Sequence, residues 1–378
     1  MSRIVRVEMC RFDYRVVGTF KFLKPGADGV VRRPSVLIRL TDDDGYQGWG
    51  QTVPMPTWSY ETPETVETTL RHYIAPVILG TDPEDIQQVH ARMHEAIKPA
   101  FSTGQPMCKA GVDIACYDLV SRKRGVPVSQ ILGGASLHTL TLSWTVAAAG
   151  IEEAEKQMEE GLGKGYRHFN MKVGAPQSPE YDVQLAKMIR RNAPDCFLWA
   201  DANTGYTLET ALQVAPRLAD AGVNMLESPL PPAQIRAYQT LRKQGALPIL
   251  MDEGILSPVE AEEFVALGMM DGIALKPARN AGLWYSRQIV RLLKENGLMV
   301  LGSGLTDPDL ALAAAIHLYS WADIRLPCAL NAPQFLEDWL TGDALQPQQG
   351  QIHVPQSPGL GVAIDPAVES RLEVIAEV

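Results

Sequence analysis

Apolar and polar residues alternate along two N-terminal stretches, which is the pattern of half-buried β-strands. Residues 3–12 and 34–53 have this two-residue period. The second stretch is interrupted at Asp44-Gly45, a pair typical of a tight turn between antiparallel strands. We therefore expect one strand in the first stretch and a hairpin in the second.

A helical period of apolar positions follows these strands. We expect helices that begin near Thr62, near Asp82 and near Met107, and the last is expected to end at Gly125. Strands followed by helices are typical of an α+β unit, which we assign to residues 1–135.

From residue 136 the pattern changes to short apolar strands that alternate with amphipathic helices. The predicted strands read HTLTLSWTVA, HFNMKV, CFLWAD, VNMLES, LPILMDE, GIALK, LMVLGS and IRLPCAL. Eight such units favour an α/β fold with a closed parallel barrel over residues 136–345. A doubly wound sheet is the alternative, although no Gly-rich phosphate turn is present. The tail, residues 346–378, contains the strand-like IHVP and is expected to pack back on the N-terminal unit.

Composition excludes several classes of protein. Of the 378 residues, 46% are hydrophobic and 21% charged, which rules out disorder, collagen and coiled coil as the main state. The net charge of −10 disfavours binding to nucleic acid. Five well-separated cysteines without a Cys-x-x-Cys pair argue against a disulfide framework or a zinc ribbon. With no signal-like or membrane-spanning apolar segment, we expect a cytoplasmic protein that does not bind membranes.

Charged residues recur where the barrel strands are predicted to end. Successive strands end in Lys172, Asp201, Glu227, Asp252 and Lys276, each about one βα unit after the last. The carboxyl ends of barrel strands meet at one rim, where active sites of this fold lie. We therefore expect these five side chains to converge.

Three converging carboxylates repel one another, and without a cation at least one would take up a proton. All-oxygen ligation points to Mg²⁺, with Mn²⁺ as a substitute, rather than to zinc. A metal nearby and partial burial should lower the pKa of Lys172 and Lys276, which would make each a usable base. Taken singly, a strand-end carboxylate is often the N-cap of the next helix and a strand-end lysine a solvated charge, but five in register are hard to explain that way.

The order of these five residues resembles the enolase superfamily, in its muconate-lactonizing-enzyme-like branch (the mandelate racemase/muconate lactonizing enzyme family). The local matches, spread over the whole chain, are WADANTGY, ESPLPP, ILMDEG, LKPARNAG, GVDIACYDLVSRKRGVPVSQILGG and PGLGVAID. The resemblance implies a modified (β/α)₇β TIM-type barrel with an α+β capping domain built from the N-terminus and the C-terminal tail.

It also implies a reaction. Mg²⁺ would bind the substrate carboxylate, a base would remove the proton α to it, and the metal would stabilise the enediolate. On this mapping Asp201, Glu227 and Asp252 are metal ligands, and Lys172 and Lys276 are the acid/base pair. Supporting positions are implied for Glu253, which could replace Asp252 as the ligand, and for Asn203 and Asn170.

The sequence departs from the branch at three strand ends. Asn170 stands where the branch usually has the first lysine of Lys-x-Lys. The seventh strand ends in residues 302–304, Gly-Ser-Gly, without the histidine of the mandelate-racemase-like branch. The eighth reads Ala-Leu-Asn-Ala-Pro over residues 329–333, without the Asp-x-Asp of dipeptide epimerases. These differences bear on the substrate rather than on proton abstraction.

Two loops of the N-terminal unit, residues 18–33 and about 50–60, are the expected substrate-contacting loops of such a capping domain. Candidate contacts are Trp58, Tyr60, Trp144 and Asn331, with a place in the domain interface or core as the alternative for the tryptophans. The first loop also carries four cations, which would attract an acidic substrate or be ordinary surface charges: Lys21, Lys24, Arg32 and Arg33.

Three functions remain open on the sequence. The first is a Mg²⁺-dependent isomerase of a small-molecule carboxylate, either a racemase/epimerase or a cycloisomerase. The second is a lyase, a dehydratase of a sugar acid or β-hydroxy (amino) acid that uses the same two lysines. The third, more remote, is a non-catalytic binding barrel. The resemblance further implies a homo-oligomer, a dimer or an octamer.

Overall fold

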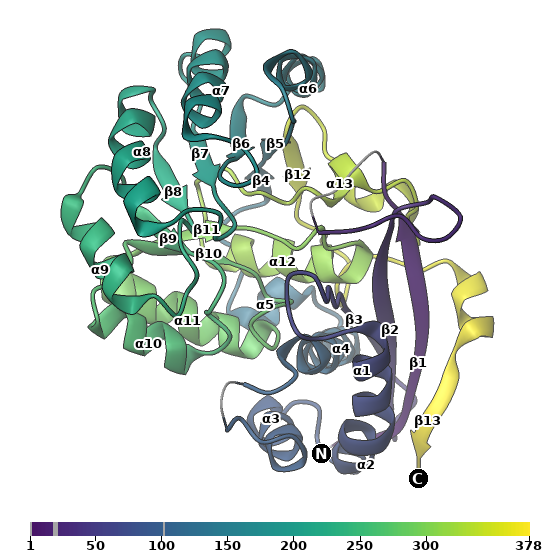
Figure 1. Cartoon of the computed structure of the whole chain (residues 1–378). Helices are drawn as coiled ribbons and strands as arrows, with labels where there is room; N and C mark the ends of the chain where they lie inside the picture. Colours follow the sequence, from purple (N-terminus) through teal and green to yellow (C-terminus); the bar gives the residue numbers. More distant parts are fainter. Residues whose placement is uncertain (1, 18–21, 101–102) are drawn as a thin grey trace.

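The computed structural model describes residues 2–17, 22–100 and 103–378. Its N-terminal unit is a sheet in the strand order β13-β1-β2-β3, antiparallel throughout and covered by helices (Figure 1). The strands are β1 (Ile4–Arg15), β2 (Arg32–Asp42), β3 (Gln47–Thr52) and β13 (Glu373–Glu377). The helices are α1 (Pro63–Thr69), η1 (Leu70–Ile74, a π-helical turn), α2 (Ala75–Ile78), α3 (Ile86–Ala96), α4 (Pro106–Arg124) and α5 (Val128–Leu132).

The helix boundaries in this unit follow local capping chemistry. Thr62 and Thr65 form a reciprocal capping box at the start of α1, and Gly125 ends α4 in the left-handed conformation, as expected. The helix expected near Asp82 begins later, at Ile86, because the Asp85 side chain caps it by accepting the N–H of Gln88.

Two glycines of β3 let the long helix α4 lie directly on the sheet. A Cβ at Gly50 would stand 1.9 Å from the carbonyl oxygen of Gly111, and one at Gly48 would stand 2.3 Å from that of Ala115. Any side chain at either position would push α4 off the strand. This contact places the N-terminal end of α4 beside the barrel.

The second unit is a barrel whose parallel strands run in chain order from β5 to β11, with helices around them (Figure 1). Its strands are β5 (Ser143–Val146), β6 (His168–Lys172), β7 (Leu198–Asp201), β8 (Met225–Glu227), β9 (Ile249–Met251), β10 (Gly272–Leu275) and β11 (Met299–Gly302), and the short strand β4 (Thr139–Thr141) precedes them outside the barrel sheet. Its helices are α6 (Ile151–Gly163), α7 (Pro179–Asn192), α8 (Leu208–Asp220), α9 (Ile235–Gln244), α10 (Pro258–Ala266), α11 (Leu283–Glu295), α12 (Asp309–Trp321) and α13 (Ala332–Phe335). The predicted α/β fold, a TIM-type barrel with a capping domain, is confirmed.

The barrel closes without a regular eighth strand. The segment IRLPCAL, predicted as a strand, forms only single bridges, from Cys328 to Leu142 and from Ala329 to Ser303. Pro327 has no N–H to donate, which prevents a longer ladder at this position. The barrel interior is filled by one apolar cluster below the strand ends, made of Trp199, Met225, Leu250, Leu301 and Ala329.

The C-terminal tail, residues 346–378, contacts the capping unit through β13 and the segment that leads into the barrel through β12 (Gln351–His353). After the 3₁₀ turn η2 (Gly342–Leu345), strand β12 pairs with β4, the strand directly before β5. Leu360 then donates its N–H to Asp118 of α4. After a second 3₁₀ turn, η3 (Pro366–Arg371), strand β13 pairs with β1 (Figure 1). The described part of the chain contains no helix that is both long and apolar enough to cross a bilayer.

A buried lysine connects the end of α3 to α4. The ammonium of Lys109 donates to the carbonyl oxygens of Ile97 (2.9 Å) and Thr103 (3.0 Å) and lies 3.0 Å from Nδ1 of His94. Burial lowers the pKa of Lys109 to about 8. The folded protein therefore holds this proton less tightly than the unfolded chain does.

Lys109→Met should remove a pH-dependent contribution to stability. Between pH 8 and 10.5 the unfolded chain keeps a proton that folded Lys109 has lost, so the free energy of unfolding rises with pH, by up to about 3 kcal/mol. Urea unfolding of wild type and variant across this range measures the difference in slope. The matched control is Lys98→Met, at an exposed site on the same segment. Parallel pH profiles for wild type and Lys109→Met would contradict the prediction.

Candidate active site

Five charged side chains meet at the carboxyl ends of β6 to β10. Lys172 pairs in register with Asp201, and Asp201 pairs with Glu227, each at the last residue of its strand. Asp252 and Lys276 directly follow β9 and β10. All five predicted residues therefore lie on one rim of the barrel.

The lysines contact the carboxylates from both sides of the row. Nζ of Lys172 donates to Oδ2 of Asp201 at 2.5 Å. Nζ of Lys276 donates to Oδ2 of Asp252 and lies 3.8 Å from Oε1 of Glu227. The three carboxylates are almost completely buried. Their charges are therefore balanced by cations of the protein.

Glu227, in the middle of the row, is the least compensated of the three. Neither of its carboxylate oxygens has a hydrogen-bond partner among the described residues. Burial, with the charges of Asp201 and Asp252, raises the pKa of Glu227 well above its usual value. Buried carboxylate oxygens without donors suit a hard divalent cation such as Mg²⁺, which binds through oxygen ligands.

A buried arginine holds Asp252. Arg279 donates to Oδ1 of Asp252 and is itself anchored to the carbonyl oxygen of Ala274 at 3.1 Å. Burial alone would raise the pKa of Asp252, but Lys276 and Arg279 outweigh it and lower this pKa. Sequence reasoning gave Arg279 no role, although it stands three residues after Lys276 in the quoted LKPARNAG, one helical turn away.

The strand-end carboxylates are not helix caps. The side chain of Thr207 caps α8, six residues after Asp201, and that of Ser257 caps α10, five residues after Asp252. Residue Gln234 occupies the N-cap position of α9, well after Glu227. The carboxylates are thus free of this structural role and face the rim.

The expected fall in the pKa of Lys172 depends on a metal ion beside it and stays a prediction. Burial lowers the pKa of Lys172, but the carboxylates of Asp201, Glu227 and Asp252 outweigh it, so the pKa is raised. The expectation assumed a cation between the lysines and the carboxylates. Without that cation, the ammonium groups are the counterions of the site.

The supporting residues lie close to the row. Asn203 donates its N–H to Oδ1 of Asp201 at 2.9 Å and lines the cleft above the strand ends. Glu253 accepts a hydrogen bond from Trp58 (below), and burial and the charge of Asp252 raise its pKa. Asn170 lies two residues before Lys172 on β6, buried below it, and its Oδ1 has no partner among the described residues.

The capping unit covers the cleft through its second loop. Nε1 of Trp58 donates to Oε1 of Glu253 at 3.0 Å, and the ammonium of Lys276 lies 5.4 Å from the centre of a Trp58 ring. Asn331 lines the same cleft and accepts from Thr306 at 3.3 Å. The other cap-side walls are apolar, from Phe22 and Met55, and Leu305 of the barrel adds a further apolar contact.

Two predicted substrate contacts lie elsewhere. Tyr60 is 53% exposed and is not among the described residues that line the cleft. Trp144 aligns with Phe169 on β5 and β6, not with the inward-facing Asn170, so its side chain points out of the barrel. There it packs against Gly161 of α6 and edge-on to Tyr166.

The cations of loop 18–33 also differ from the expectation. Arg33 is fully buried and donates to the carbonyl oxygens of Val53 (2.6 Å), Pro54 (2.8 Å) and Leu305 (2.9 Å). It therefore ties the loop that carries Trp58 to the barrel. Arg32 pairs with Asp28, Lys24 is exposed, and Lys21 lies outside the described residues.

Among the described residues, one group of three carboxylates has oxygens that all lie within 4.8 Å of one another, and it is Asp42 to Asp44 in the β2–β3 turn rather than the row at the rim. Asp42 accepts backbone N–H groups of that turn and pairs with Lys123, and Asp44 pairs with the same lysine. These carboxylates are occupied by turn and ion-pair contacts. The cluster therefore lacks the unpartnered oxygens found at Glu227.

Protein-family models match both units of the chain. The family model "Mandelate racemase / muconate lactonizing enzyme, N-terminal domain" matches residues 23–133, and "Enolase C-terminal domain-like" matches residues 151–368. Muconate cycloisomerase 1 of Rhodococcus opacus is 30% identical to this chain, and the alignment covers 96% of each of the two chains. An N-succinyl-L-Arg/Lys racemase of Bacillus cereus is 26% identical over 91% of this chain and 92% of its own. The crystal structure of 2-chloromuconate cycloisomerase from Rhodococcus opacus 1CP has a TM-score of 0.87 at 26% identity, over 99% of this chain and 100% of that one.

Arg279→Met should destabilise the metal-free protein by about 3–5 kcal/mol, because it leaves the buried carboxylate of Asp252 without its guanidinium partner. Chemical unfolding in the presence of a chelator measures this loss. Arg325→Met is the matched control, since Arg325 pairs with Asp323 on the surface, where such a pair contributes about 1 kcal/mol or less. An equal, small effect of both substitutions would show that the Arg279 pair contributes little to stability.

Proposed function

Since the chain belongs to the mandelate racemase/muconate lactonizing enzyme family of the enolase superfamily and is an enzyme of the cycloisomerase and racemase type, we propose that it removes the proton α to a substrate carboxylate at this rim. The observation that carries the proposal is the row Lys172, Asp201, Glu227, Asp252 and Lys276 along successive strand ends. A non-catalytic barrel has no support, since each of these positions keeps its charged residue.

We assign a Mg²⁺ site to Asp201, Glu227 and Asp252. The unpartnered oxygens and raised pKa of Glu227 support the assignment. When bound, Mg²⁺ would supply Lewis-acid stabilisation of the negative charge that develops on the substrate carboxylate. Asp252 is preferred to Glu253 as the third ligand because Glu253 already accepts from Trp58, whereas Asp252 lines the cleft. Arg279 fixes the orientation of Asp252 by holding Oδ1, and Asn203 does the same for Asp201.

The two lysines are proposed as the acid/base pair. Lys172 on β6 and Lys276 after β10 flank the carboxylate row, so they would reach opposite faces of a substrate carbon held between them. Released from its ion pair with Asp201, a neutral Lys172 accepts the α-proton, and the ammonium of Lys276 returns one to the other face. Asn170 is neutral, so it does not lower the pKa of Lys172 as a lysine at this position would.

The cleft also favours a class of substrate. Its cap-side wall is apolar and aromatic, through Phe22, Met55 and Trp58, and the amide of Asn331 is a neutral polar contact. The charged side chains among its described lining residues are those of the row itself. We therefore propose a small carboxylate with an apolar or neutral body.

Glu227→Gln should weaken Mg²⁺ binding by about 100-fold or more and, without metal, raise the free energy of unfolding by on the order of 1 kcal/mol. The amide loses the ligand charge but also the repulsion from Asp201 and Asp252. Titration calorimetry and chelator-treated unfolding measure the two effects. The control Asp43→Asn, in the β2–β3 cluster, should change neither. Normal Mg²⁺ affinity in Glu227→Gln would refute the metal site.

Proton NMR in D₂O with Mg²⁺ tests the reaction. A panel of sugar acids, N-acyl amino acids, hydroxyprolines and lactonizable diacids should contain a member whose α-proton exchanges, and EDTA should abolish this exchange. Lys172→Ala and Lys276→Ala should each reduce exchange from one face by about 10²–10⁴-fold while metal affinity persists. Exchange from both faces at the wild-type rate in either variant would refute the role of that lysine.

The product distinguishes the reaction types. Racemisation or lactone formation without loss of water identifies an isomerase, and release of water identifies the dehydratase alternative, which uses the same lysines. The predicted homo-oligomer and cytoplasmic location stay predictions.

A further inference from the structure

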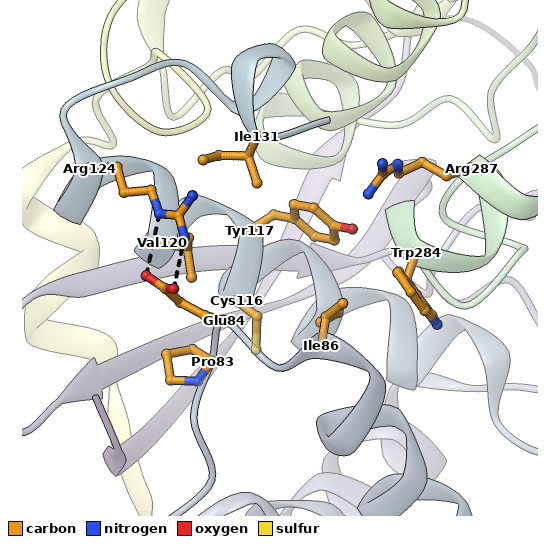
Figure 2. A pocket seen from close by; sticks show the side chains of 10 residues that line it. All are labelled: Pro83, Glu84, Ile86, Cys116, Tyr117, Val120, Arg124, Ile131, Trp284 and Arg287. Atoms are coloured by element: carbon orange, nitrogen blue, oxygen red, sulfur yellow. Dashed lines mark hydrogen bonds and ion pairs between the residues drawn. The ribbon is translucent and has the colours of Figure 1, made fainter. Parts of the chain in front are cut away.

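A pocket of about 270 Å³ lies at the joint between the capping unit and the barrel, and we call it the seam pocket. Its walls come from the segment before α3, from α4 and α5, and from α11 of the barrel (Figure 2). It shares no lining residue with the cleft above the strand ends. The proposed function leaves it without a role.

The seam pocket has mostly apolar walls. Ile86, Val120, Ile131 and the indole of Trp284 supply them (Figure 2). Its volume exceeds the roughly 150 Å³ at which a cavity already binds benzene. One six-membered ring with a short substituent therefore fits inside.

Two polar groups in this pocket have no acceptor. The hydroxyl of Tyr117 is buried, in a side chain only 5% exposed, and has no hydrogen-bond partner among the described residues. Nε of Arg287 is also buried and has no hydrogen-bond partner among the described residues. Figure 2 shows the Tyr117 hydroxyl directed to the side of the pocket where Arg287 and Trp284 lie. Two buried donors side by side, one of them cationic, form a site for an anion.

The surrounding groups leave these donors available. Burial, and next the charge of Asp113, raise the pKa of the Tyr117 phenol and outweigh the opposite effect of the nearby Arg287 guanidinium, so the phenol keeps its proton. The guanidinium of Arg287 lies over the ring of Trp321, 5.4 Å from its centre, which fixes its position without neutralising it. Arg124 and Glu84 lie on the other side of the pocket and neutralise each other at 2.8 Å.

The end of α11 is not the source of the attraction. Asp113 of α4 already accepts the first backbone N–H groups of this helix, those of Leu283 (2.5 Å) and Trp284 (3.3 Å). Any anion in the seam pocket would be held by side chains. A phosphate dianion would meet only these two donors, because the remaining sides are apolar walls and the mutually neutralised Arg124–Glu84 pair.

We propose that the seam pocket binds a small aromatic monocarboxylate, whose carboxylate accepts from the Tyr117 hydroxyl and the Arg287 guanidinium and whose ring packs on Trp284, Ile86 and Ile131. The site is separate from the proposed catalytic rim and does not require its metal. Because Tyr117 belongs to the capping unit and Arg287 to the barrel, the ligand joins the two units, and its binding stabilises the joint.

Benzoate is the probe, with EDTA present so that no metal-dependent binding at the rim contributes. Saturation-transfer NMR and calorimetry on the full chain should detect its binding, and the neutral isostere benzamide should not bind. Tyr117→Phe should weaken benzoate binding about tenfold, and Arg287→Leu should weaken it more. The matched control Arg291→Leu, an exposed site one turn further along α11, should bind as wild type does.

Other results would overturn the proposal. These are no binding at millimolar benzoate, equal affinity in Tyr117→Phe and wild type, or loss of binding in Lys276→Ala, which would place the benzoate in the rim cleft. A changed assembly mass in Arg287→Leu would instead assign this guanidinium to a contact between copies of the chain. Tyr117→Phe removes a single hydroxyl, so the test stands even if Arg287→Leu fails to fold.

Discussion

Compensation of buried negative charge at the barrel rim is the constraint on which the rest of this structure depends. Asp201, Glu227 and Asp252 are buried away from water at the ends of neighbouring strands. Buried carboxylates are stable only where cations lie beside them. Lys172, Lys276 and Arg279 supply those cations in the metal-free chain. Lys276 lies 3.8 Å from Glu227, yet neither carboxylate oxygen of Glu227 has a hydrogen-bond partner among the described residues, and this is the position to which the proposed divalent ion is assigned.

The capping unit completes this electrostatic arrangement rather than merely covering it. The guanidinium of Arg33 donates hydrogen bonds to carbonyl groups of the Trp58 loop and of Leu305, and these bonds fix the loop over the strand ends. Trp58 then donates to Glu253 beside the carboxylate row. A wall of this kind excludes water from the cleft, and the lower local dielectric strengthens each interaction between the rim charges and a substrate.

The contacts between the two units also explain why they act as one enzyme. Helix α4 lies on the cap sheet, where Gly48 and Gly50 admit its backbone, and reaches the barrel through Asp113, which caps α11. Its Tyr117 faces the same barrel helix across the seam pocket. A ligand in that pocket would therefore act on the joint that positions the capping loops.

Much of this arrangement followed from the sequence because its physics is local or periodic. The βα repeat placed Lys172, Asp201, Glu227, Asp252 and Lys276 on one rim, since each strand ends at the same edge of a parallel barrel. Their residue types indicated a divalent metal ion, and their order carried the family resemblance that implies activation of a substrate carboxylate. The capping box at Thr62 and the stop at Gly125 are likewise set by neighbouring residues.

Tertiary structure alone decided which way Trp144 points, that Arg33 is buried, that Arg279 pairs with Asp252, and that Tyr117 and Arg287 meet. Each of these features depends either on contacts between residues distant in the chain or on which face of a strand a side chain occupies. The local pattern of apolar and polar positions encodes neither of these two.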